Sequence, residues 1–582
     1  MARVLAPPLC TRRARRGPRW AGVGRIGAPL VCAIALAGCG SAHTGATAAP
    51  PSAAVPASVP LYAEAVVRPE GALKSRALAV GRALTHGSNP YLALLGALQT
   101  PGSPRPAYAG QVAPWLGARA GIFLTSTAGS EQLLKLAAAG LLGGSATSAL
   151  SFGSGGLQGA VLLDVSSAAG ARSFLARAAR RAGAHSDSYR GVAYEASSGG
   201  LALGMVGSFA VIGSEAALRS VIDTTLGGAS LARSQSYRKL VALAPPQTLA
   251  HLYSDPPAAG LSQAGEAGML ALLAGSRQSN ISLVPGGSSA QLDADSLTGA
   301  SSSAPGGLLS AGAQGAGALE ELPSGSWLAL GLGDLGQTLG QDASALAELS
   351  SLLTGSGAPS TSGAGALVSL ESIVSALVVP LQALGANTAQ ARTDFTSWMS
   401  SGGIFASGSG LLELKAAVAI NSTDPARSRA AVAKLAGALR RAGDATEQVS
   451  LPGTEAAAAV HVSGLPLVLY IADGRASNGR TKLVLGLGEA SVAAALAPPG
   501  TLAGSATLAA AAAHLGAAGG ATAVIEVPTL VGLLESLQLT EEPSLAKYVP
   551  ALRAITTLDA GARQLSPEVQ RLGVYVGLRE AG

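Results

Sequence analysis

An order of landmarks that occurs twice along the chain constrains its fold more than any other feature of the sequence. Each copy begins with a proline and a short apolar strand, continues through helical stretches to a tryptophan, and then has a glycine followed by an Ile-Phe pair. After these come a strand, an alanine- and arginine-rich helix ending in Arg-Arg-Ala-Gly, a strand that runs into a helix, and a Leu-Ala segment. Matches in one order indicate an internal duplication.

The matched segments have similar spacing in the two halves of the chain. They are residues 60–63, 115–123, 162–183, 210–216 and 231–237 in the first half, and 323–330, 398–405, 418–443, 484–490 and 502–508 in the second. Strands outnumber helices in each copy and several adjoin one another. We therefore predict an α+β fold of two similar units, each a mostly antiparallel sheet with helices packed on one face. We also expect Gly183 and Gly443 to cap the arginine-rich helices, with Arg181 and Arg441 at equivalent places.

The amino-terminal segment has the pattern of an export signal. Seven arginines and no acidic residue precede an apolar run at residues 26–37, which is how the charged and apolar regions of a signal peptide are arranged. This run is shorter than the roughly 20 residues that a transmembrane helix needs. Leu36, Ala37, Gly38 and Cys39 resemble the lipobox of bacterial prolipoproteins. We expect cleavage between Gly38 and Cys39 and a lipid on the Cys39 sulfur; the alternative is an ordinary signal peptide with a chance cysteine.

Loss of the leader changes the charge and the cysteine content. The chain has a net charge of +6, and the leader carries seven basic and no acidic residues, so the mature body has a net charge of −1. A nucleic-acid partner is therefore not expected. Cys10 and Cys32 leave with the leader and Cys39 is lipidated, which excludes thiol catalysis and cysteine-ligated metals in the body. Abundant alanine and glycine with little lysine indicate a GC-rich, actinobacterial source.

Composition also divides the chain. Residues 1–38 are the predicted signal peptide, and residues 39–58, rich in Ala, Pro, Ser, Thr and Gly, are a predicted flexible tether. A Ser/Gly/Ala-rich stretch at residues 299–321 is the predicted linker. It separates a first α+β unit at residues 59–298 from a second at residues 322–582.

Several short motifs of the first half are shared with a known family. They are Pro-Trp-Leu-Gly at residues 114–117, Tyr-Arg-Gly-Val-Ala-Tyr at 189–194, Val-Ile-Gly-Ser at 211–214 and Leu-Ala-Arg-Ser-Gln-Ser-Tyr at 231–237. In these motifs the chain resembles the actinobacterial family catalogued as domain of unknown function 3352, whose members are often exported or tethered to a membrane. The likeness is weaker in the second half, where Trp398 lacks the flanking Pro and Leu-Gly, and Leu508 replaces the tyrosine. It implies location and architecture but no activity.

Nominal catalytic and cofactor motifs are few. Residues 331–336 fit the pattern GxGxxG after a predicted strand, but no second parallel strand ending in an acid about 20 residues on is visible. The chain has no GxxxxGK[ST] phosphate loop and no GxSxG nucleophile elbow. Its histidines form no HxxxH or HxxEH pair, so solvated or core imidazoles are expected rather than a metal site. They are His43, His86, His185, His251, His461 and His514.

The remaining candidates favour structural roles. Asp293 and Asp295 lack the further ligands of a calcium loop, so we predict two carboxylates on the same face of an edge strand. Asp255 has no recognisable catalytic partner and is expected in a turn after a strand. Trp115 and Trp398 have the strongest claim to a role, and we predict that both are core residues. The sequence thus predicts no catalytic, cofactor or metal site.

The function that follows is that of a non-enzymatic binding or scaffolding lipoprotein. It would be held at the outer face of the cytoplasmic membrane by the lipid on Cys39. An alternative is a carrier of a lipid or other hydrophobic ligand, for which an apolar cavity of roughly 300 to 1,000 Å³ is the diagnostic feature. A hydrolase is the third possibility, and a cleft that gathers a histidine, a carboxylate and a serine would favour it.

Overall fold

The computed structural model of the chain describes residues 49–85, 108–126, 152, 156–255, 278–297, 312–336, 394–462, 467–516, 520–541, 546 and 548–580. Gly38 and Cys39, the predicted cleavage and lipidation residues, lie outside these ranges, as do His43 and His86. Among the described residues, no helix has the length and apolarity that a membrane crossing requires.

The elements up to residue 297 are mostly strands. The strands are β1 (Leu61–Val66), β2 (Leu116–Leu124), β3 (Gly159–Val165), β4 (His185–Tyr189), β5 (Val192–Ala196), β6 (Leu201–Val206), β7 (Phe209–Ser214), β8 (Ala250–Ser254), β9 (Ser279–Pro285) and β10 (Ser289–Leu297). The helices are η1 (Pro51–Ala53), α2 (Gly71–Thr85), α4 (Tyr108–Gln111), α6 (Ala168–Ala182), α7 (Glu215–Thr225), η2 (Leu231–Arg233) and α8 (Gln235–Val241).

The elements from residue 312 onward follow a similar succession. The strands are β11 (Ser326–Leu332), β12 (Met399–Ser407), β13 (Lys415–Ser422), β14 (Ala445–Val449), β15 (Thr454–His461), β16 (Leu469–Arg475), β17 (Thr481–Leu487), β18 (Gly520–Glu526), β19 (Ile555–Ser566) and β20 (Val569–Leu578). The helices are α10 (Gly312–Glu320), η6 (Thr396–Trp398), α15 (Pro425–Ala442), α16 (Glu489–Leu496), α17 (Ala506–Leu515), α18 (Val527–Ser536), η7 (Leu539–Glu541) and α20 (Val549–Ala554).

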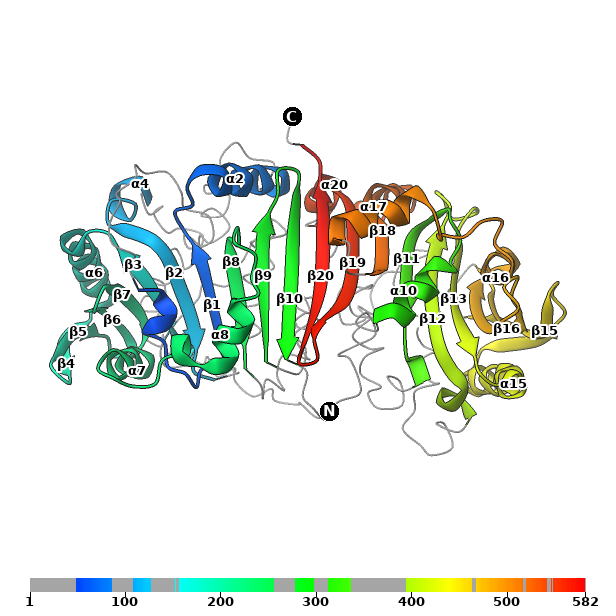
Figure 1. Ribbon diagram of the computed structural model, residues 1–582, viewed down its shortest axis with the longest axis horizontal. Helices are drawn as coiled ribbons and strands as arrows, with labels where there is room; N and C mark the ends of the chain where they lie inside the picture. The colour runs from blue at the N-terminus through cyan, green and yellow to red at the C-terminus, as the bar shows by residue number, and fades with distance from the viewer. Residues whose placement is uncertain are drawn as a thin grey trace, which may run out of the picture.

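All of these strands belong to one antiparallel sheet of 20 strands that runs along the length of the molecule (Figure 1). From one end to the other the pairings run β4-β5-β6-β7-β3-β2-β1-β8-β9-β10-β20-β19-β18-β11-β12-β13-β17-β16-β15-β14. Strands β10 and β20 lie side by side at the centre of Figure 1, and the order of strands on one side of this pair matches the order on the other.

The predicted fold class is therefore wrong, because the two halves do not form separate sheets. Strand β10 pairs with β20 along its whole length, from Ser289 opposite Gly577 to Leu297 opposite Val569. This ladder satisfies the backbone groups of two strands that would otherwise be exposed sheet edges. Asp293 and Asp295 consequently lie in an internal strand, between β9 and β20, and not at the edge that we predicted.

Helices cover both faces of the sheet and not one face, which is the second correction to the fold class. In β3 the side chains of Leu163 and Leu162 point to opposite faces; Leu163 packs in the cluster that contains α6, and Leu162 in the cluster that contains α7 and α8. The second half is built in the same way, with α15 against one face and α16 and α17 against the other. Strands buried on both faces have continuous apolar runs, such as Val161–Leu163, instead of alternation.

Local sequence explains where the main helices begin and end. The Ser167 hydroxyl accepts a hydrogen bond from Gly170 N at the start of α6, and the Asp424 carboxylate accepts bonds from two backbone N–H groups at the start of α15. Gly183 and Gly443 follow the two helices with φ of +62° and +109°. The predicted glycine caps are confirmed, because this left-handed conformation is costly for residues that have a Cβ.

Packed structure begins earlier than the predicted unit boundaries. Residues 51–53 form η1, and Ala54 and Val55 are buried in the first-half core, although we assigned residues 39–58 to the tether. Residues 312–320 of the predicted linker form α10, and Leu319 is fully buried. Small residues made both segments resemble linkers in the sequence, yet their few apolar side chains pack against the sheet.

Candidate functional site

The two tryptophans singled out in the sequence are core residues, as predicted. Trp115 is 2% exposed and Trp398 is fully buried. Each indole N–H donates to the backbone carbonyl four residues earlier, over 2.7 Å to Gln111 and 2.9 Å to Asp394. Because the polar edge of each ring is occupied and its faces are enclosed, neither tryptophan offers a platform for a ligand.

The GxGxxG segment serves the packing of a helix. Gly331 lies in β11, and a Cβ at this position would come within 1.9 Å of the Gly315 carbonyl oxygen in α10. Strand β11 has antiparallel neighbours on both sides, β12 and β18. The parallel strands of a dinucleotide-binding unit are therefore not present around this segment.

The two aspartates of β10 bind an arginine. Asp295 is fully buried and forms two hydrogen bonds of 2.7 Å with Arg571 of β20, from Nε and Nη2. Asp293 lies 3.4 Å from the same guanidinium and accepts a hydrogen bond of 2.8 Å from Gln291. Burial raises the pKa of Asp295, and the Arg571 guanidinium opposes this rise. These carboxylates join the two halves of the sheet. Their oxygens contact Arg571 and Gln291, which is a structural arrangement and not that of a calcium loop.

The described histidines do not come together. His185 and His461 are exposed, at β4 and β15. His251 Nε2 lies 3.2 Å from the Tyr237 hydroxyl, and His514 Nδ1 lies 2.6 Å from the buried carboxylate of Asp559. Within the described ranges, no group of three or more His, Cys, Asp and Glu residues is placed to hold a metal ion.

Asp255 follows β8 in the predicted position. Its carboxylate accepts hydrogen bonds from Gln278 over 2.9 Å and from Tyr253 over 3.5 Å, and no histidine of the described ranges bonds to it. The arrangement ties the ends of β8 and β9 together, which suits a structural role.

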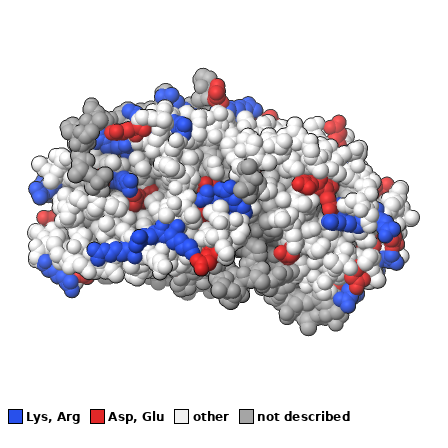
Figure 2. Space-filling view, in the orientation of Figure 1, with Lys and Arg blue, Asp and Glu red and all other residues white. Residues whose placement is uncertain are grey.

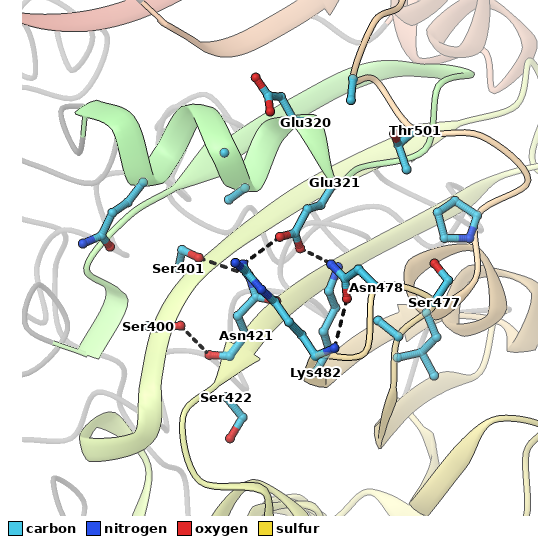
Figure 3. A pocket seen from close by; sticks show the side chains of 18 of the residues that line it. Glu320, Glu321, Ser400, Ser401, Asn421, Ser422, Ser477, Asn478, Lys482 and Thr501 are labelled. Carbon is cyan, nitrogen blue, oxygen red and sulfur yellow. Dashed lines mark hydrogen bonds and ion pairs between the residues drawn. The ribbon is translucent and has the colours of Figure 1, made fainter.

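A polar cavity of 820 Å³ in the second half has the best geometry for a binding site (Figure 3). Helix α10 and the residue after it form one wall, β12, β13 and β17 form the floor, and residues 476–480 and 496–503 complete the rim. Its side chains are mainly hydroxyl, amide and charged groups. They include Gln314, Glu320, Glu321, Ser400, Ser401, Asn421, Ser422, Thr423, Ser477, Asn478, Arg480, Lys482 and Thr501.

An irregularity in the pairing of β12 with β13 brings polar groups to the floor. The register shifts between Met399 and Gly402, so that two residues, Ser400 and Ser401, stand opposite the single residue Asn421. The Ser400 hydroxyl donates to the backbone carbonyl of Asn421, and the side-chain amide of Asn421 donates to the Ser401 hydroxyl, both over 3.1 Å. A bulge of this kind turns side chains away from the regular alternation of the strand.

The wall is fixed by a network of charges. Glu321 lies 2.8 Å from Arg480 Nη1 and 2.9 Å from Lys482 Nζ (Figure 3). The Lys482 side chain is 5% exposed, and that of Glu321 is 19% exposed. With Glu320, the four charged groups of the lining sum to zero. The cavity is therefore polar but has no net charge.

Asn421 keeps an unused hydrogen-bonding atom although it is only 5% exposed. Its Oδ1 has no hydrogen-bond partner. The Ser401 hydroxyl can either accept a hydrogen bond from Asn421 Nδ2 or donate one to Oδ1. Exchanging the positions of Nδ2 and Oδ1 in the Asn421 amide would therefore leave Nδ2, instead of Oδ1, without a partner. Glu321 Oε2 also has no aligned hydrogen-bond donor, although its distance to Lys482 Nζ is that of an ion pair. Buried polar atoms are rarely left unpaired, so the enclosed Asn421 Oδ1 favours a bound water that donates a hydrogen bond, whereas Lys482 already neutralises Glu321 Oε2.

Sequence reasoning did not single out any residue of this cavity. Its polar groups come from residues 314, 320–321, 400–401, 421–423, 477–482 and 501, which no local motif connects. The Ser-Ser-Gly at residues 400–402 is the one local sign, because it interrupts an apolar strand. Neither this cavity nor His514 and Asp559 assembles the histidine, carboxylate and serine that would favour a hydrolase.

Comparisons with known proteins give one family and two weak structural likenesses. The profile described as "Protein of unknown function (DUF3352)" matches residues 107–463. No curated protein matches the sequence. Two solved structures, crystal forms I and III of TP0453, are similar to 44% of this chain. The similar region spans 81% and 83% of the two TP0453 chains, with 9% sequence identity and a TM-score of 0.25 in each case. Likeness at that level supports no argument about fold or function.

Proposed function

Because the chain belongs to the DUF3352 family, which has no assigned activity, we propose a function from the site itself: binding of an uncharged, hydroxyl-rich ligand of the saccharide class. The observation that carries the proposal is the lining of the cavity, in which serine, threonine, asparagine and glutamine side chains surround a space of no net charge, with the Asn421 amide at its floor. Saccharide hydroxyls both donate and accept hydrogen bonds and carry no charge, which matches a lining with no net charge. The volume of 820 Å³ lies within the range of roughly 300 to 1,000 Å³ usual for ligand sites.

The same proposal includes export and anchoring. The leader, the lipobox at residues 36–39 and the absence of acidic residues before it support a lipoprotein held at the outer face of the cytoplasmic membrane. A saccharide ligand would belong to that compartment. We assign the protein a binding role and not an enzymatic one, because the polar groups of the cavity hold one another in place and none of them pairs a nucleophile with a base.

The carrier of a hydrophobic ligand has less support. The cavity has the volume that we expected for a carrier, but most of the residues that line it have hydroxyl, amide or charged side chains. An apolar ligand placed there would remove hydrogen bonds with water from these groups without replacing them.

Titration calorimetry of the full chain in detergent, with uncharged oligosaccharides built either from N-acetylated amino sugars or from sugars without nitrogen, tests the proposal. We expect at least one of them to bind, and Asn421→Leu to weaken binding by about tenfold or more, because a buried hydrogen bond is lost. Ser409→Ala is the matched control, since Ser409 is exposed and outside the cavity. A chain that binds none of the sugars, or an Asn421→Leu variant that binds like the control while remaining folded by circular dichroism, would contradict the proposal.

A further inference from the structure

A second cavity, of 910 Å³, lies in the first half and differs from the first in charge. It is open to solvent and is lined by residues 50–52, by β1, β2 and β8, and by the segment of η2 and α8. Four basic residues line it, Arg119, Arg233, Arg238 and Lys239, against the single acid Glu64. Figure 2 shows basic side chains in a row at the lower left, over the place that α8 occupies in Figure 1.

Two of the four cations have acidic partners. Arg119 Nη1 lies 3.1 Å from Glu64 Oε1, and Lys239 forms an ion pair with Glu568, in the turn between β19 and β20. Arg233 and Arg238 are exposed, and within the described ranges neither forms an ion pair with an acid. The mouth of the cavity therefore has two guanidinium groups whose charge no acid in the described part of the chain compensates.

The floor does not repel an anion. Glu64 is 6% exposed, and both of its oxygens are occupied, one by Arg119 and the other by the Tyr62 hydroxyl at 2.6 Å. Tyr237 is 5% exposed, and its hydroxyl lies 3.2 Å from His251 Nε2. Burial raises the pKa of Tyr237 and lowers that of His251, so the tyrosine stays protonated and the histidine neutral at pH 7. The net charge that remains at the cavity comes from its basic groups.

We propose that this cavity binds a phosphoryl group, with Arg233 and Arg238 meeting its charge at the mouth and Arg119, held by Glu64, as a third cation of the lining. Guanidinium groups suit this role because their planar N–H donors match the oxygens of a phosphate. A phosphoryl group can come from a small soluble phosphomonoester or from the headgroup of a lipid. The site is separate from the saccharide cavity, so the two proposals stand or fall independently.

The test is calorimetry of the full chain in a nonionic detergent with three probes: inorganic phosphate, glycerol 3-phosphate and short-chain dihexanoyl phosphatidic acid. Similar affinity for the last two identifies a soluble phosphomonoester as the source, and tighter binding of the lipid identifies a headgroup; either result supports the site. Sodium sulfate at the same ionic strength measures binding by charge alone.

The decisive comparison is between two double variants with the same loss of charge. Arg233→Gln with Arg238→Gln should weaken phosphoryl binding by about tenfold or more. Arg172→Gln with Arg177→Gln removes two exposed arginines from α6, on the opposite face of the sheet, and should leave binding unchanged. The proposal is overturned if no probe binds more tightly than sulfate, or if the two double variants weaken binding equally.

Discussion

Replacing Arg571 by methionine tests whether the central pair of strands depends on a buried charge. Arg571 is 9% exposed, Asp295 0% and Asp293 1%, and Arg571 also donates a hydrogen bond of 2.8 Å to the Leu243 carbonyl. The variant leaves Asp295 without its two hydrogen bonds of 2.7 Å. Removing one partner of a buried ion pair costs about 3–5 kcal/mol. We expect a loss of unfolding free energy in that range at pH 7.

The pH dependence gives a second measure of the same effect. The pKa of Asp295 is already raised by burial, so the stability that depends on this group is fully present below its unfolded-state pKa of about 3.9 and falls as the pH rises through its folded-state pKa. Arg571 opposes the rise, and its removal therefore raises the pKa of Asp295 further. The destabilisation caused by Arg571→Met should shrink as the pH is lowered from 7 towards 4, because the carboxyl group is then protonated.

Urea unfolding followed by tryptophan fluorescence is the assay. Trp115 reports on the first half, and Trp327 and Trp398 report on the second; all three are at most 5% exposed. Arg553→Met is the matched control, because Arg553 pairs with Glu535 at 2.8 Å while their side chains are 56% and 46% exposed. An exposed pair of this kind contributes about 0–1 kcal/mol. Adding Asp295→Leu to Arg571→Met should recover part of the loss, with a coupling energy of about 1–3 kcal/mol. If Arg571→Met is as stable as Arg553→Met, the assignment of a stabilising role to this ion pair is refuted.

The remaining predictions concern a buried acid, two helix ends, the anchor and metals. Burial raises the pKa of Asp473, which is fully buried and accepts a hydrogen bond of 2.6 Å from the Ser428 hydroxyl. The stabilising contribution of this carboxyl group is present below its unfolded-state pKa of about 3.9 and is lost as the pH rises through its folded-state pKa. Asp473→Asn should therefore stabilise the chain at pH 7 by on the order of 1 kcal/mol, and urea titrations should show that the gain disappears near pH 4. Gly183→Ala and Gly443→Ala meet no atom within 4 Å and should each cost about 1–2 kcal/mol through the left-handed backbone alone; unchanged urea midpoints would exclude this account. Cys39→Ala should leave uncleaved precursor without a lipid. Mass spectrometry and detergent partitioning of the wild-type and variant chains measure this difference. A wild-type chain without lipid mass would show that the lipobox assignment is wrong. Purified protein should contain no stoichiometric zinc or calcium and should keep its melting temperature in a chelator; a large fall on chelation would contradict the prediction.

Local features of this chain could be predicted from the sequence because they depend on neighbouring residues. The glycines after the two arginine-rich helices are C-caps, since only residues a few positions apart decide whether a helix ends there. The burial of Trp115 and Trp398 was predictable because each immediately precedes an apolar strand. The family was also recognisable, since its motifs are continuous segments.

The two cavities could not be predicted, because each depends on residues that are distant in the sequence. Glu64 meets Arg119 only when β1 pairs with β2, and Glu321 meets Lys482 only after several strands have paired. The bulge that places Ser400 and Ser401 opposite Asn421 depends on the register between β12 and β13. Register is set by hydrogen bonds between strands and by the packing of both faces, and neither has a local signature in so alanine-rich a chain.

The sequence by itself determined the apolar strands that recur in both halves, the ends of the two arginine-rich helices, and the burial of Trp115 and Trp398. The tertiary structure decided that β10 and β20 join all the strands into one sheet, and that helices cover both of its faces. Backbone hydrogen bonds between sheet edges depend little on residue type, so the sequence of neither strand identifies its partner. Asp295 and Arg571, 276 residues apart, mark this junction only once the two strands lie side by side.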